Sequence, residues 1–127
     1  MGPSQRIAPG ATSRPAPLGD DRWDPAEGMA RIDRAGRALV SSPGRETLDA
    51  YQAEVRAFVS QIAARSYRLT QERTLDASGR PRRFHKLLEV DRELIRLAET
   101  VLGREKDRLG ILSRVDAIRG LIMDLYR

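Results

Sequence analysis

The segment LDAYQAEVRAFVSQIAARSYRL, residues 48–69, decides the fold class of this 127-residue chain. Its large apolar residues recur at spacings of three and four, so they lie on one face of an α-helix, as expected for a helix with a single buried face. The pattern predicts a helix from about 43 to 75, longer than the average globular helix. The positions on this face are Leu48, Tyr51, Val55, Phe58, Ile62, Ser66 and Leu69.

Helical patterns also lie on both sides of this segment. WDPAEGMARIDRAGRALV, residues 23–40, opens with Asp24 as a capping residue and Pro25 at the first helical position. On the other side, LLEVDRELIRLAETVL (87–102) forms a broad apolar stripe, and the last 17 residues form a second one. The two stripes are rotated by roughly 100° if the helix is continuous, so residues 103–110 are either a kink or a loop. A fourth helix is the favoured interpretation.

No strand pattern competes, and the sequence predicts an all-α protein. We expect a bundle of three to four helices around a long antiparallel helical hairpin, in a single domain formed by residues 23–127. Residues 1–22 are rich in Pro, Gly, Ala and Ser, and they are expected to be a disordered tail. The chain has no cysteine and no apolar run of the roughly 20 residues that a membrane span needs. We therefore expect a cytoplasmic protein without a membrane span or a cofactor.

The net charge of +5 is concentrated in residues 65–86, where seven basic residues face only Glu72 and Asp76. This basic tip of the hairpin could bind nucleic acid, bind an acidic protein, or simply be solvated. No nucleic-acid-binding signature accompanies it. The basic residues are Arg65, Arg68, Arg73, Arg80, Arg82, Arg83 and Lys86.

A second candidate surface lies in the last helix, in VDAIRGLIMDLYR (115–127). Gly120 costs a helix interior about 1 kcal/mol relative to Ala, and it lies opposite the apolar seam. It is either a tolerated surface glycine or a point where another backbone approaches closely. That backbone could belong to the first helix, to a second copy or to a partner. The candidate face consists of Asp116, Arg119, Gly120 and Asp124.

Two stretches resemble a known family. IDRAGRALVSSPGRETLDAYQAEVRAF (32–58) resembles a recurring pattern of the bacterial YaaR-like proteins, and VDAIRGLIMDLY (115–126) is similar to that family's ending. The resemblance covers about three quarters of the chain. It implies an all-helical cytoplasmic protein without an assigned enzymatic activity. The Pro- and Ala-rich N-terminus departs from the family pattern.

Individual polar residues give little evidence for an enzyme. Asp91 falls near the centre of the apolar stripe of residues 84–102, so we expect it to be a buried carboxylate paired with an arginine or a tyrosine hydroxyl, with access to solvent between helices as the alternative. His85 and Glu89 lie one turn apart, which is too few ligands for a zinc site. No phosphate-binding loop or nucleophile motif is present. The sequence thus favours a non-enzymatic protein-interaction module, for which a homodimer is one option, over a nucleic-acid-associated protein.

Overall fold

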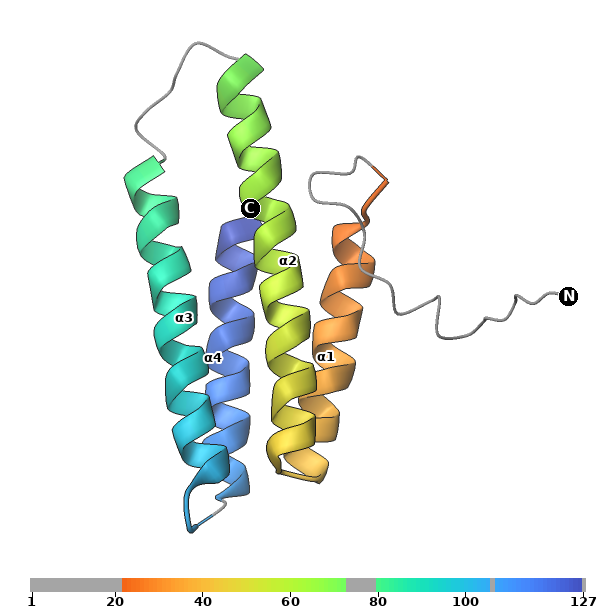
Figure 1. Cartoon of the computed structure of the whole chain (residues 1–127), viewed down its shortest axis with the longest axis vertical. Helices are drawn as coiled ribbons and strands as arrows, with labels where there is room; N and C mark the ends of the chain where they lie inside the picture. The colour runs from red at the N-terminus through yellow and green to blue at the C-terminus, as the bar shows by residue number, and fades with distance from the viewer. Residues whose placement is uncertain (1–21, 73–79, 106, 127) are drawn as a thin grey trace, which may run out of the picture.

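The computed structural model describes residues 22–72, 80–105 and 107–126. It contains four helices, which run alternately up and down and are connected in sequence order (Figure 1). They are α1 (Pro25–Ser41), α2 (Arg45–Glu72), α3 (Arg80–Leu102) and α4 (Arg108–Tyr126). The all-α prediction is confirmed, and the described ranges contain no strand. The predicted disordered tail lies almost wholly outside the described residues.

The helix ends follow from local capping chemistry. Asp24 accepts a hydrogen bond from the backbone N–H of Ala26 at 3.0 Å, and Pro25 follows it as the first helical residue. Asp107 caps α4 in the same way, because its carboxylate accepts from the N–H of Leu109 at 3.2 Å. The chain therefore turns between α3 and α4. This confirms a separate fourth helix and excludes a kinked continuous one.

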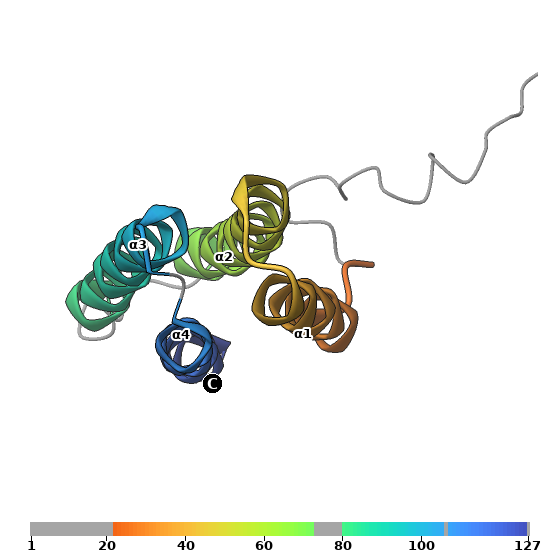
Figure 2. The same ribbon diagram turned by 90° about the horizontal axis from the view of Figure 1, so that it is seen from below.

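The helices pack as two antiparallel pairs, α1 with α2 and α3 with α4 (Figure 2). Helix α4 contacts the other three, whereas α1 and α3 do not touch within the described residues. Each helix buries one apolar face in a single core. The buried residues of this core are Ile32, Leu39, Leu48, Tyr51, Val55, Phe58, Ile62, Val90, Leu94, Leu97, Val101, Ile111, Ile118, Ile122 and Leu125.

A buried glycine brings α1 close to its neighbours. A Cβ atom at Gly36 would lie 3.1 Å from Val115 Cγ1 of α4 and 3.4 Å from Tyr51 Cε1 of α2. Because Gly36 has no side chain, three helices meet at this point without a clash. The sequence pattern does not reveal this role of Gly36, and close packing was expected at Gly120 instead.

Helices α2 and α3 extend past the ends of α1 and α4 at one end of the bundle (Figure 1). Part of each helix there lacks the neighbours that cover it elsewhere. Tyr67 of α2 and Phe84 of α3 are accordingly 66% and 59% exposed. Within the described part of the chain, no helix is long and apolar enough to cross a membrane.

Candidate functional site

Helix α3 carries two rows of residues with coiled-coil spacing, and only one of them is covered. The inner seam follows steps of three and four through Leu87, Val90, Leu94, Leu97 and Val101. Its last four members are at most 2% exposed. The outer seam has the same spacing and is rotated by roughly 100° from the inner one. It consists of Phe84, Leu88, Asp91, Ile95, Ala98 and Leu102.

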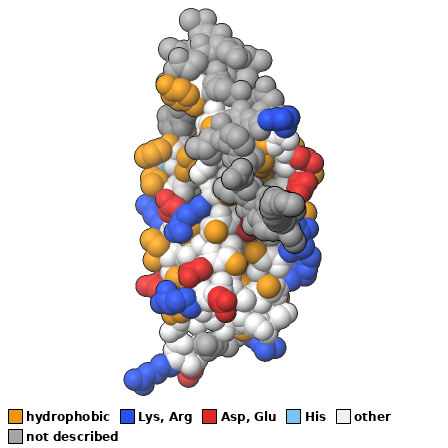
Figure 3. All heavy atoms as spheres, turned by 45° about the vertical axis from the view of Figure 1, so that its right-hand side comes forward, with side chains coloured by type: hydrophobic (Ala, Val, Ile, Leu, Met, Phe, Trp, Pro, Cys, Tyr) orange, Lys and Arg blue, Asp and Glu red, His pale blue; other side chains and the backbone are white. Residues whose placement is uncertain are grey.

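The outer seam exposes four large apolar side chains. Ile95 and Phe84 are 60% and 59% exposed, Leu102 is 46% exposed and Leu88 is 36% exposed. They span 18 residues, or about 27 Å of helix. Figure 3 shows hydrophobic side chains surfacing at intervals down one side of the molecule, between charged groups. A row of exposed apolar side chains is typical of a binding surface even where it is interrupted, as here by Asp91 and the partly buried Ala98, whereas single exposed apolar residues are not.

Asp91 lies in the outer seam and is exposed. The prediction that it is buried was wrong. The apolar stripe of residues 84–102 is two seams rather than one, and Asp91 lies near the midline between them. Since no helix of the described part of the chain packs over Asp91, its carboxylate reaches solvent without needing an internal partner.

Charged side chains fix α3 against α4 on the side away from the outer seam. Glu93 accepts from Arg114 of α4 at 3.1 Å and from Arg96 at 2.9 Å. Asp91 and Arg92, by contrast, form no ion pair with another described residue. The flank of the outer seam therefore carries charges that the fold itself does not use.

The predicted basic tip is only partly described, and its described cations are engaged within the chain. Arg65 donates to the Trp23 carbonyl at 2.8 Å and stacks over the Trp23 ring at 5.0 Å. Lys86 pairs with Asp124 of α4 at 3.4 Å. The side chains of Arg68, Arg80, Arg82 and Arg83, and all of Arg73, lie outside the described residues. Nucleic-acid binding by this tip stays a prediction.

The candidate face on α4 is an open surface next to two ion pairs. Arg119 donates to both Asp33 oxygens of α1, at 3.1 and 3.4 Å, and Asp124 holds Lys86 of α3. A Cβ atom at Gly120 would meet nothing within 4 Å. Close approach of the first helix at Gly120 is therefore excluded, and a tolerated surface glycine or an external partner remain as explanations.

One buried polar atom lacks a partner. The hydroxyl of Tyr51, which is fully buried between α1, α2 and α4, is the one side-chain atom of this kind among the described residues. Burial raises the pKa of Tyr51 well above its usual value near 10, and the nearby carboxylates of Asp33 and Asp116 raise it further. Tyr51 is thus a neutral core residue at ordinary pH.

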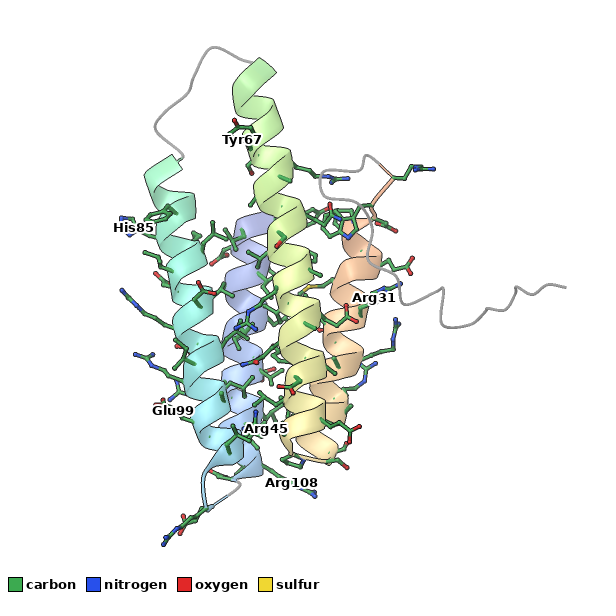
Figure 4. The ribbon with its side chains drawn as sticks, in the orientation of Figure 1. Arg31, Arg45, Tyr67, His85, Glu99 and Arg108 are labelled. Carbon is green, nitrogen blue, oxygen red and sulfur yellow. The ribbon has the colours of Figure 1, made fainter. Side chains whose placement is uncertain are left out.

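The surroundings of His85 give no evidence for a metal-binding role. His85 is exposed and points away from the bundle (Figure 4). Among the residues that the structure describes, no three His, Cys, Asp or Glu side chains are grouped to hold a metal ion. The outer seam of α3 is consequently the best-defined candidate site, and it is suited to binding rather than to bond chemistry.

Comparison with known proteins gives a family and a fold. Residues 26–126 match the family described as Protein of unknown function (DUF327). The chain is 26% identical to the uncharacterized protein YaaR of Bacillus subtilis over 98 residues, which cover 77% of this chain and 67% of that protein. The resemblance to YaaR-like proteins is thereby confirmed.

Two solved structures share the fold at 30% sequence identity. The uncharacterized protein BH1478 from Bacillus halodurans matches with a TM-score of 0.70, over 81% of this chain and 84% of that one. Moevan, a designed granulopoietic protein made by topological rescaffolding, matches with a TM-score of 0.74, over 81% and 88%.

Proposed function

The chain belongs to the DUF327 family of proteins of unknown function, and we propose that it is a non-enzymatic protein-interaction module that binds through the outer seam of α3. The observation that carries this proposal is the exposure of Phe84, Leu88, Ile95 and Leu102 in one coiled-coil row. The cytoplasmic location expected from the sequence is part of the same proposal.

The physical argument is the cost of leaving this row in water. Burying an apolar side chain contributes about 1.5–3 kcal/mol, and about half of that contribution is missing for each of these four side chains. The spacing of the row matches a helix that packs beside it, as in helix-in-groove recognition. The exposed charges of Asp91 within the row and of Arg92 beside it supply the polar groups that give an interface its specificity.

Capture from a lysate of the source organism tests the proposal. Tagged wild-type chain is compared with Leu88→Glu/Ile95→Glu, which places two carboxylates in the outer seam. Leu109→Glu is the matched control, because Leu109 is 77% exposed but lies on α4. All captures are repeated after nuclease treatment, and bound proteins are identified by mass spectrometry.

We expect specific proteins, this chain included, to be retained by the wild type and by Leu109→Glu and lost from the double variant, with or without nuclease. Identical capture by all three chains would overturn the use of the outer seam. Capture that disappears with nuclease would instead favour the basic tip and nucleic acid, and salt dependence would then be steep.

A further inference from the structure

We propose that the partner seated on the outer seam of α3 is the α3 helix of a second copy of this chain, packed antiparallel. This inference rests on the proposed function, since it names the occupant of the same surface. The register of the outer seam and the charges along α3 support this occupant.

The register gives complementary layers when two copies are related by a two-fold axis at residue 93. A coiled-coil seam has two kinds of core position, one that follows a step of four residues and one that follows a step of three. In an antiparallel pair each position of one kind faces a position of the other kind, so the two seams match along their length. Phe84 then faces Leu102 of the second copy, Leu88 faces Ala98, and Asp91 faces Ile95. Each layer occurs twice, so the row of about 27 Å is covered along its whole length. The largest side chains also meet smaller ones.

The charges of α3 favour the antiparallel direction. Residues 80–90 hold four basic residues and one acidic residue, a formal charge of +3. Residues 91–102 hold two basic and three acidic residues, a formal charge of −1. Lys86 and Glu93 already pair with α4, so these totals overstate the charge beside the outer seam. Their signs still favour the antiparallel pair, which places each positive half beside a weakly negative half, whereas a parallel pair stacks the two positive halves together.

The charge of Asp91 disfavours a parallel pair of α3 helices and favours an antiparallel pair. In a parallel pair the two Asp91 carboxylates would face each other across the seam and repel. In the antiparallel register, Arg92 of the second copy lies about 4.5 Å along the axis from Asp91, within reach of a long side chain. Since neither residue forms an ion pair with another described residue of its own chain, both are available. A single charged position in an otherwise apolar seam commonly fixes register in this way.

The oligomeric state of the purified full chain gives the first test. Sedimentation equilibrium over a concentration series should show the mass rising from 14.2 kDa toward twice that value. Leu88→Glu/Ile95→Glu should weaken the dimer by on the order of 100-fold or more, because it buries four carboxylates per dimer. Leu109→Glu should not. Circular dichroism shows whether each variant stays folded.

Cross-linking tests the direction, and the chain suits it because it has no cysteine. A mixture of Phe84→Cys and Leu102→Cys chains, carrying tags of different mass, should form mixed disulfides on oxidation. Phe84→Cys alone should not, since the antiparallel register separates the two thiols by about 27 Å. A disulfide needs Cα atoms within roughly 7 Å.

The outcomes separate this inference from the proposed function. A monomer at all concentrations overturns the inference, and seam-dependent capture of a different protein would then still support the proposed function. A dimer that survives Leu88→Glu/Ile95→Glu places the contact elsewhere and overturns the inference. Efficient cross-linking of Phe84→Cys to itself means a parallel pair and overturns it as well. A seam-dependent dimer with only mixed disulfides supports it.

Discussion

The inner and outer seams of α3 have the same spacing and are mostly apolar, yet one is covered and the other is largely exposed to water. Leu94 is 1% exposed, and its chain neighbour Ile95 is 60% exposed. The difference arises from the arrangement of the bundle, because α2 and α4 cover one side of α3, whereas no helix among the described residues covers the outer seam beyond the partly buried Ala98. The spacing of an apolar row on a helix therefore does not decide by itself whether the row is covered within the same chain.

The largest expected change in stability comes from comparing substitutions at Leu94 and Ile95. Leu94→Ala removes a buried side chain and should lower the free energy of unfolding by about 3 kcal/mol. Ile95→Ala should lower it by less than about 1 kcal/mol, because the side chain is already mostly in water. Urea unfolding at low protein concentration measures both without a contribution from self-association. Equal losses would mean that the outer seam is packed within one chain.

Gly36 of α1 and Gly120 of α4 extend the contrast to these two helices. Gly36→Leu forces a side chain into Val115 and Tyr51 and should cost about 2 kcal/mol or more. Gly120→Ala meets open space and should instead stabilise the fold by up to about 1 kcal/mol. Thermal unfolding distinguishes these signs. Destabilisation by Gly120→Ala would reveal a contact on the open face of α4.

Removal of the buried hydroxyl of Tyr51 is expected to raise the free energy of unfolding. Tyr51→Phe deletes a buried group without a hydrogen-bond partner and should stabilise the fold by about 1 kcal/mol at neutral pH. No change, or a loss, would mean that the hydroxyl is satisfied.

The same hydroxyl should make the free energy of unfolding depend on pH in alkaline solution, because burial raises its pKa. Below pH 10 the phenol is neutral in both states. Above pH 10 the unfolded chain ionises first, so the wild-type free energy of unfolding falls by up to about 1.4 kcal/mol per pH unit. The gap between Tyr51→Phe and wild type should therefore widen above pH 10, as chemical unfolding at several pH values would show. A constant gap would contradict the raised pKa.

The smallest effect is expected at the surface ion pair between α3 and α4. Lys86→Met breaks the contact with Asp124 but keeps the aliphatic stem, and it should cost no more than about 0.5 kcal/mol. Urea unfolding at low and high salt would check this. A cost above 1 kcal/mol that salt does not reduce would show that the pair is more than a solvated contact.

Most of the fold could be predicted from the sequence because periodicity and capping residues report local structure directly. The caps at Asp24 and Pro25 and the helix through residues 48–69 needed no tertiary information. The break before α4 was visible as a change in the direction of the apolar stripe, although only the Asp107 cap decides between a loop and a kink.

The site could not be predicted in the same way, because exposure depends on which helix lies where. Merging the two seams of α3 into one stripe placed Asp91 near its centre and led to the wrong expectation of burial. The signal that separates them is present in the sequence as two interleaved rows of threes and fours. Gly36 and Gly120 are likewise both glycines within helices, and only their neighbours distinguish a close contact from open space.

The most direct test of the central claim is the concentration dependence of the backbone amide NMR spectrum of the wild-type chain. If the outer seam binds a second copy, amide shifts should move with concentration in residues 84–102 and stay constant around Gly120. Leu88→Glu/Ile95→Glu should abolish the movement. Spectra that do not change with concentration, or changes centred on Asp116, Gly120 and Asp124, would contradict the account.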